Sequence, residues 1–263
     1  MDSSEWVKLE HHEGVLIVTL NRPKANAFNF QMIEALHAAL RTAERDPQVR
    51  VVLLTGSGGI FSAGQDVKEF GQAAEAGELS FRQHLQRTYN PLILKIRQLA
   101  KPVLAAVNGP VAGAAMGIVL ACDLRIAAEN ARFVVGFSGI GLAPDSGVSL
   151  FLPALIGLGR AAEYTYTNQP ISAEQALAWG LVNRVSSAEA LPAAALAWAV
   201  ELSQGPVHAM GLSKRAFNRS VYPNLESTLD YEAHIQEIAG HGPDHQEGLQ
   251  AFLEKRAPVY TPG

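Results

Sequence analysis

The sequence predicts an α/β fold in which buried strands are covered by helices, and three observations lead to this prediction. Short β-branched runs alternate with segments of helical periodicity as far as about residue 135. Beyond that point the pattern is mostly helical. The chain has 263 residues, of which 48% are apolar and 17% are charged, so it is long enough for a large core and too poor in charge to be disordered.

The first half of the chain supplies the alternating strands and helices. The run 14–21 is β-branched and ends at Arg22-Pro23, which predicts a strand. Asn29 is a suitable N-cap for a helix over 29–45. Patterns of the same kinds predict strands at 51–55, 103–107 and 124–127, helix and loop at 67–77, a long amphipathic helix at 80–100 with a kink at Pro91, and a helix of small residues at 112–122.

The second half is expected to be helical. The segment Ser172-Ala-Glu-Gln175 has the form of a capping box, and Gly180 is a suitable C-terminal stop for the helix that it begins. Further helices are expected at 188–203, 206–219, 224–239 and 244–255. We place a boundary near residue 200, which divides the chain into a core at 1–200 and a C-terminal region at 201–263.

Charge and cysteine content exclude several classes of protein. A formal net charge of −4 without any run of Lys or Arg argues against nucleic acid as a partner. The single cysteine, Cys122, excludes a disulfide framework and a cysteine-based zinc site, and it fits a cytoplasmic protein. The polar start of the chain predicts no secretory signal.

The charged residues are distributed unevenly. Residues 102–122 include none, and residues 133–159 include only Asp145. Membrane spans are not expected, because Asn108-Gly109-Pro110 interrupts the first run and glycines, a proline and the aspartate interrupt the second. Both runs instead predict strand and helix segments buried inside the protein.

Four familiar site patterns are absent from the sequence. The turn 56–59 is not a dinucleotide fingerprint, because Phe61 stands where its third glycine is needed. His241 and His245 lie four residues apart, but Gly242-Pro243 between them breaks any shared helix face, so no metal site is expected. The sequence also contains neither a phosphate-binding loop nor a nucleophile elbow.

Two segments of small residues are candidates for binding a ligand through the backbone. They are F-S-A-G-Q-D at 61–66 and N-G-P-V-A-G-A-A-M-G at 108–117. The second is a strand-to-helix junction, where the first helical turn has free N–H groups and the positive end of the dipole. The two segments together can form an oxyanion hole, or they can simply allow close packing of helix and sheet.

Asp145 is open to two interpretations. As the lone charge of an uncharged stretch, it is costly if buried, and burial raises a carboxyl pKa into the range useful for proton transfer. Alternatively, Pro144-Asp-Ser-Gly147 is an exposed turn with good turn residues.

A series of blocks runs in order over nearly the whole chain: L-N-R-P (20–23), F-S-A-G-Q-D (61–66), K-P-V-L-A-A-V-N-G (101–109), C-D-L-R-I-A (122–127), G-L-A-P-D-S-G (141–147), S-A-E-Q-A-L-A-W-G-L-V (172–182) and F-L-E-K-R (252–256). Together they resemble the crotonase family, the enoyl-CoA hydratase/isomerase superfamily. The resemblance implies a spiral of repeated ββα units followed by helices used for trimerisation, in a homotrimer or a hexamer of two trimers.

The resemblance also implies roles for individual residues. The two oxyanion-hole N–H groups correspond to Ala63 and Ala114, and Asp145 corresponds to a catalytic aspartate of some isomerases and of aryl-CoA dehalogenases. The two glutamates of a hydratase are replaced by Gly117 and Phe137, so ordinary hydration is not expected.

The remaining implied residues belong to the substrate-binding surfaces. Coenzyme A is expected at Lys24, Ala25, Ala63, Gln65, Asp66 and Val67, and at Phe252 and Lys255 of a neighbouring subunit. The acyl pocket is expected at Gly117, Phe137, Ala115 and Leu142. No separate cofactor is implied, because coenzyme A is part of the substrate.

A finer resemblance links segments 89–92, 133–138, 141–147 and 252–263 to the subfamily of ring 1,2-epoxyphenylacetyl-CoA isomerases of bacterial phenylacetate degradation. It implies an acyl-CoA isomerase that shifts a double bond or rearranges a ring epoxide through an enolate. The alternatives are an enoyl-CoA hydratase, another lyase or a dehalogenase of the same family, and, from another class, a non-catalytic acyl-CoA-binding subunit.

Overall fold

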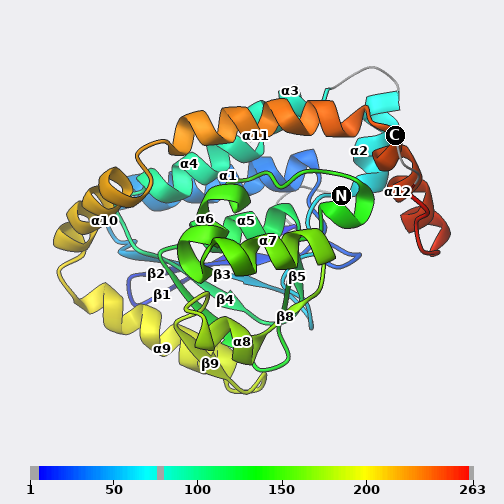
Figure 1. Ribbon diagram of the computed structural model, residues 1–263. Coiled ribbons are helices and arrows are strands. Elements are labelled where there is room, and N and C mark those ends of the chain that lie inside the picture. The colour runs from blue at the N-terminus through cyan, green and yellow to red at the C-terminus, as the bar shows by residue number, and fades with distance from the viewer. Residues whose placement is uncertain (1–5, 76–79, 261–263) are drawn as a thin grey trace.

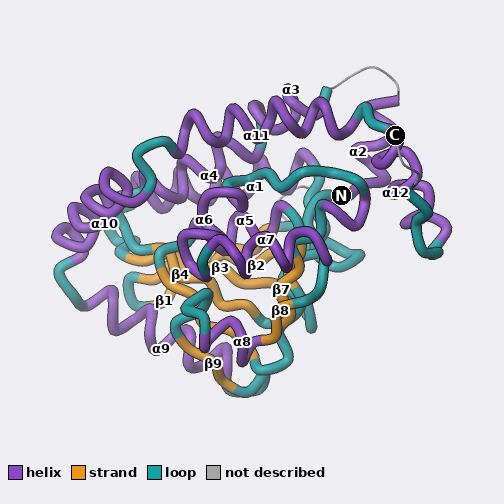
Figure 2. The backbone as a smooth tube through the Cα atoms, in the orientation of Figure 1, coloured by secondary structure: helices purple, strands orange, loops and turns teal. Residues whose placement is uncertain are grey.

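The computed structural model describes residues 6–75 and 80–260, whose strands lie in two sheets (Figures 1 and 2). The larger sheet has the order β1-β2-β3-β4-β6-β9, with only the β1–β2 pair antiparallel. Its strands are β1 Val7–His12, β2 Val15–Leu20, β3 Val51–Gly56, β4 Val103–Val107, β6 Leu124–Ala128 and β9 Arg184–Ser186. The smaller sheet has the order β5-β7-β8, formed by β5 Val111–Ala112, β7 Arg132–Val134 and β8 Ile171–Ser172.

Helices cover both faces of the larger sheet. The helices are α1 Phe30–Arg45, α2 Val67–Glu75, α3 Phe81–Arg87, α4 Tyr89–Gln98, α5 Ala114–Ala121, α6 Val148–Ile156, α7 Leu158–Thr167, α8 Ala173–Ala178, α9 Leu191–Gln204, α10 Val207–Val221, α11 Leu225–Gly240 and α12 Pro243–Glu254, with a short 3-10 helix at Ser138–Ile140. Figure 1 shows α9 below the sheet and α1, α4 and α11 above it. The predicted α/β fold is confirmed.

Strand β3 illustrates why both faces are covered. Val51 and Leu53 face the layer that contains α9, whereas Val52 and Leu54 belong to the core beneath the other helices. A strand that alternates between two buried faces needs apolar residues at every position. This explains its continuous run of apolar residues.

The chain repeats one path between the two sheets. After β4 it enters β5 of the smaller sheet and then α5, and after β6 it enters β7 and, later, α6. Each passage carries the chain from a strand of the larger sheet, through a strand of the smaller one, into a covering helix. The repeated ββα units that the resemblance implies therefore correspond to an arrangement in the structure.

Several features differ from the sequence prediction. Strands β5, β7, β8 and β9 had no predicted counterpart, since they are only two or three residues long. Strand β1 was not predicted, because it is an edge strand with a mostly polar, exposed sequence and is set by pairing with β2. The expected single helix at 80–100 is two helices, and the break lies at Thr88 rather than at Pro91. Pro91 falls in the first turn of α4, where its missing N–H costs no helical bond. Of the expected helix and loop at 67–77, residues 76 and 77 lie outside the described residues.

The C-terminal half contains the expected helices, together with the unpredicted strands β8 and β9. Ser172 and Gln175 form the predicted capping box, and Gly180 has the left-handed backbone of a helix stop, with φ 79°. Helices α9 to α12 correspond to the predicted set. Residue 200 lies within α9, and the division of the chain there stays a prediction. Of the helices in the described part of the chain, none has the length and apolarity needed to cross a membrane.

Candidate active site

The loop at 61–66 is held beside the loop that follows β2. Asn26 is buried, and its side-chain amide donates to the carbonyl oxygens of Ser57, Ile60 and Phe61, each at 3.1 Å. In return, the Ser62 hydroxyl donates to the Asn26 carbonyl oxygen at 2.7 Å. The two loops therefore form one rigid edge of the site.

The contacts of this edge correct the expected role of Ala63. The N–H of Ala63 donates to the carbonyl oxygen of Ala25 at 3.0 Å, so it is not a free donor. The backbone of Gln65 makes neither bond of its bridge to Phe28. The Phe28 N–H donates to the carbonyl oxygen of Gly64, and the Asp66 N–H donates to the carbonyl oxygen of Phe28. Within the described residues the N–H of Gln65 has no acceptor, which makes it the available donor of the loop.

Helix α5 begins directly beside this donor. A Cβ added to Gly64 would lie 2.7 Å from the Ala112 carbonyl oxygen and 3.5 Å from the Ala114 nitrogen. Only a glycine allows such a close approach of two backbones, and its φ of +85° is also one that glycine adopts easily. Ala114 is the first residue of the helix, so its N–H has no helical partner. The Ala114 nitrogen therefore lies beside Gly64, the residue that precedes the Gln65 donor.

Asp145 lies buried above the next turn of α5. It is only 6% exposed, which excludes the exposed-turn interpretation. A Cβ on Gly117 would lie 2.4 Å from the carbonyl oxygen of Ser146, so the Asp145 turn packs against α5 where a side chain would otherwise stand. Among the residues expected in the acyl pocket, Gly117 therefore packs against the Asp145 turn. The others are buried or half-buried: Ala115 and Phe137 are buried, and Leu142 is half-buried.

Burial controls the charge of Asp145. Loss of hydration raises the pKa of its carboxyl to about 6, even though the Ser146 hydroxyl and the Gln236 amide both donate to it and favour the ionised form. A carboxyl with such a pKa takes up and releases a proton near neutral pH.

A second buried carboxyl, Glu232 of α11, holds the same turn. It accepts from the N–H of Gly147 at 2.8 Å and from the N–H and hydroxyl of Ser149. Burial raises its pKa to about 7. Neither Glu232 nor Gln236 was predicted from the sequence, although polar residues four apart on the buried stripe of α11 are a signal that could have revealed them.

The side chain of Gln65 is also fixed in place. Its amide oxygen accepts from the Tyr89 hydroxyl at 2.7 Å and lies 3.0 Å from Nε2 of His84. Burial lowers the pKa of His84 to about 4, so the ring is neutral and donates from Nε2 to that oxygen. These contacts fix Gln65, whose N–H is the free donor.

The residues expected to bind coenzyme A fall into two groups. Lys24 and Ala25 are exposed beside Ala63, on the same edge as Gln65 and Asp66. Asp66 forms an ion pair with Arg22 at 2.9 Å and precedes α2, which begins at Val67. Phe252, 58% exposed, and Lys255 lie instead at the end of α12.

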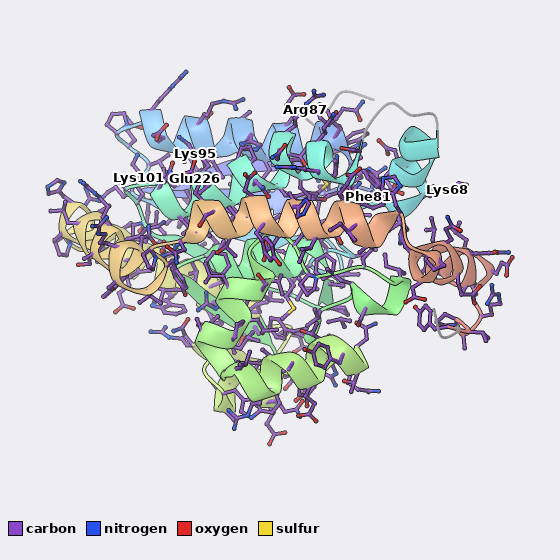
Figure 3. All side chains as sticks on the ribbon, turned by 45° about the horizontal axis from the view of Figure 1, so that its top comes forward. Lys68, Phe81, Arg87, Lys95, Lys101 and Glu226 are labelled. Carbon is purple, nitrogen blue, oxygen red and sulfur yellow. The ribbon has the colours of Figure 1, made fainter. Side chains whose placement is uncertain are left out.

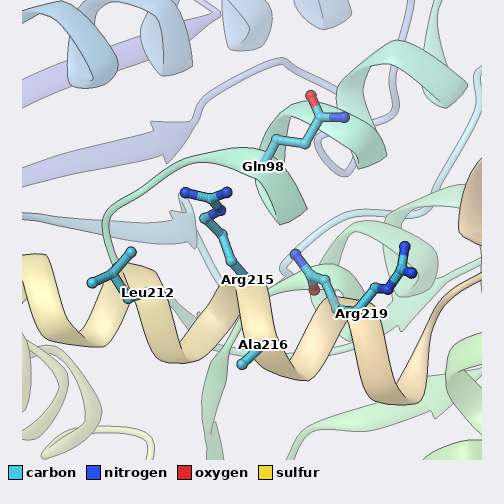
Figure 4. A pocket seen from close by; sticks show the side chains of 6 residues that line it. Gln98, Leu212, Arg215, Ala216 and Arg219 are labelled. Atoms are coloured by element: carbon cyan, nitrogen blue, oxygen red, sulfur yellow. The ribbon is translucent and has the colours of Figure 1, made fainter.

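Two surface hollows lie elsewhere. One, of about 630 Å³, is lined by Gln98 and by residues of α10 (Figure 4). The other, of about 670 Å³, is lined by Gln86 of α3 and by residues of α4, of α11 and of the turn before α11. Neither includes Asp145, Gln65 or Ala114. No group of three or more His, Cys, Asp or Glu side chains in the described ranges is arranged to hold a metal ion.

Comparisons with known proteins identify the family of this chain. The model of the family described as Enoyl-CoA hydratase/isomerase matches residues 10–262. The 1,2-epoxyphenylacetyl-CoA isomerase of Escherichia coli strain K12 is 39% identical over 258 residues, which are 98% of each chain. The 4-chlorobenzoyl coenzyme A dehalogenase-2 of an Arthrobacter species is 34% identical over 97% of this chain and 92% of that protein.

A solved structure shows the same fold. The crystal structure of an enoyl-CoA hydratase from Mycobacterium avium subsp. paratuberculosis K-10 superposes with a TM-score of 0.86 and 34% identity, over 98% of this chain and 99% of the other. The two sheets and the C-terminal helices are therefore shared with a solved member of the matched family.

Proposed function

Because the chain belongs to the enoyl-CoA hydratase/isomerase family, the crotonase superfamily, we propose that it is an acyl-CoA isomerase with Asp145 as its single acid/base. The observation that carries the proposal is the buried Asp145 carboxyl beside α5, with a pKa near 6. The similarity to a ring-epoxide isomerase supports an isomerase in particular.

The thioester oxygen binds, in this proposal, between the N–H groups of Gln65 and Ala114. Removing a proton next to the thioester carbonyl places negative charge on that oxygen, and one well-placed N–H donor contributes roughly 3–4 kcal/mol to stabilising it. The Gln65 donor replaces Ala63, whose N–H is bonded to Ala25.

Asp145 then moves one proton. For a 3-enoyl-CoA, its carboxylate removes a proton from C2, the bonding electrons pass into a dienolate, and the same proton returns to C4. The double bond moves to the 2,3 position and nothing is added or lost. A carboxyl with a pKa near 6 can both accept and return the proton at neutral pH.

Water addition is disfavoured by the surroundings. A hydratase needs two carboxylates to hold water, and at the corresponding positions this chain has Gly117, packed against Ser146, and the buried Phe137. The similarity to a dehalogenase favours one second candidate, in which Asp145 attacks an aryl ring. Turnover in H₂¹⁸O separates proton transfer by Asp145 from attack on the ring. Only the attack forms an ester of Asp145, and water that hydrolyses this ester leaves the label in the Asp145 carboxyl.

We also propose that the chain works as a trimer or hexamer in which Phe252 and Lys255 reach coenzyme A of a neighbouring subunit. Large apolar side chains are exposed on the C-terminal helices, among them Phe217, Tyr231 and Phe252. Light scattering coupled to size exclusion measures the mass, and a monomer would contradict this part of the proposal.

The decisive experiment is incubation with a 3-enoyl-CoA in D₂O. We expect a conjugated 2-enoyl-CoA, and any exchange of the transferred proton appears as deuterium in the product. Asp145→Asn should abolish this conversion and leave acyl-CoA binding near normal. Conversion by that variant at the parent rate would refute the assignment.

A further inference from the structure

We propose that Gln236 is the positioning residue of Asp145: its amide, held in one orientation by the Asp145 turn itself, fixes the carboxylate and keeps it ionised to accept the substrate proton. The inference rests on the proposed function, because it concerns how Asp145 is prepared for that reaction. Gln236 contacts the acid/base and not the reacting atoms.

The orientation of the amide follows from its partners. The oxygen Oε1 accepts from the N–H of Ala143 at 3.1 Å, and Nε2 donates to Oδ2 of Asp145 at 2.8 Å. A backbone N–H can only donate, so the amide oxygen must face Ala143 and the NH₂ group must face Asp145. Gln236 is 2% exposed, so both contacts are shielded from bulk solvent.

The donated hydrogen bond has an electrostatic consequence. An amide NH₂ can donate to a carboxylate, but it cannot accept from a protonated carboxyl, so Gln236 favours the ionised form. The Ser146 hydroxyl, 2.7 Å from Oδ1, makes the only other bond of the carboxylate among the described residues. These two donors oppose the burial that raises the pKa of Asp145.

The charged and titratable groups that face Asp145 do not replace these donors. They are Glu232 of α11 and Tyr89 of α4. A carboxyl and a phenol are either neutral or negative, so neither favours the ionised form of Asp145 by a positive charge. The ionised state of Asp145 therefore depends on Gln236 and Ser146.

Helix α11 also holds the far end of the turn. One helical turn before Gln236, Glu232 accepts from the N–H groups of Gly147 and Ser149 at 2.8 and 3.0 Å. Ser146 has a left-handed backbone with φ 56°, which a serine adopts only when its surroundings hold it there. Bonds on both sides of Ser146 thus fix the direction of the Asp145 side chain.

The test uses two variants of Gln236 and one control. Gln236→Leu keeps the approximate size and removes the donor. Gln236→Glu keeps the shape, but it can donate to Asp145 only while the new carboxyl is protonated. Glu226→Gln changes an exposed residue at the start of the same helix, at the end away from Phe81 (Figure 3). The rate of 3-enoyl-CoA isomerisation is measured from pH 5 to pH 9, with the Tm of each variant.

Gln236→Leu removes a hydrogen bond to a charged group. The midpoint of the acidic limb in its pH profile of kcat should therefore move up by about one to two pH units. At pH 6, where half of the parent carboxyl is ionised, the rate then falls about 5- to 50-fold, with KM unchanged within about twofold. Gln236→Glu should stay active near pH 6 and lose activity at pH 8, an alkaline limb that the parent lacks. Glu226→Gln should follow the parent.

A merely structural role would lower Tm without moving either limb. If Gln236→Leu folds and its acidic limb coincides with that of the parent, the role of Gln236 is refuted while the isomerase assignment stands. If Gln236→Leu does not fold, a profile of Gln236→Glu without a new alkaline limb refutes that role in the same way. An active Asp145→Asn variant would overturn the proposed function instead, and this inference with it.

Discussion

Replacing Asp145 by asparagine should make the protein more stable at pH 8 while it abolishes isomerisation. The folded chain holds Asp145 with a pKa of about 6 against an ordinary value of 3.8. Its carboxyl therefore binds a proton more tightly when folded than when unfolded. The free energy of unfolding must then fall as the pH rises from about 4 through about 6, and it stays lower above that range.

The magnitude follows from the two pKa values. Ionising the buried carboxyl at pH 8 costs the folded state about 3 kcal/mol, and at pH 4 the same cost is below about 1 kcal/mol. Asparagine removes the charge without breaking the local bonds. Its oxygen can accept from Nε2 of Gln236, and its NH₂ group can donate to the Ser146 hydroxyl.

Urea denaturation followed by tryptophan fluorescence measures this effect. Parent and Asp145→Asn are compared at pH 4, 6 and 8, at one protein concentration because the chain is proposed to assemble. Asp230→Asn is the matched control, since Asp230 is exposed on α11 and accepts one bond from Gln86 that an asparagine keeps. It should change stability by less than about 0.5 kcal/mol at every pH. A stabilisation by Asp145→Asn that is equal at pH 4 and pH 8, or absent at pH 8, would refute the reasoning.

Three further predictions concern the surroundings of the site. Gly117→Glu should not create a hydratase. It should lower the free energy of unfolding, measured by urea denaturation, by about 2–4 kcal/mol, because its Cβ would meet the Ser146 carbonyl oxygen at 2.4 Å. A variant as stable as the parent that hydrates a 2-enoyl-CoA would contradict this. Cys122 is buried with a pKa of about 12, so Ellman's reagent should label it at pH 8 only after unfolding, and rapid labelling would mean that α5 opens locally. Asn26→Ala should lower the free energy of unfolding by about 2–4 kcal/mol, since it removes bonds to three carbonyl oxygens, of which Ile60 keeps a second donor in Asn108. A loss below about 0.5 kcal/mol would argue against the rigid edge.

Local signals in the sequence predicted most of the fold. Asn29 caps α1 through the N–H of Met32, and Ser172 with Gln175 forms the capping box of α8. Such features depend on residues three or four positions apart, so they can be found without the fold. The features that were missed or misplaced, among them β1, β9 and the break at Thr88, depend instead on strand pairing and on packing against the core.

The sequence also determined the family and the residue on which the chemistry is proposed to rest. Asp145 was identifiable because it is the one charge between residues 133 and 159. Whether it is buried, and which groups set its pKa, was decided only by the tertiary structure. Its partner Gln236 lies 91 positions further along the chain. Likewise, the choice between the N–H groups of Ala63 and Gln65 depends on Ala25 and Phe28, which reach this loop only in the folded protein. Caps and periodicities are set by close neighbours in sequence, whereas burial and hydrogen-bond partners are set by which distant segments pack together.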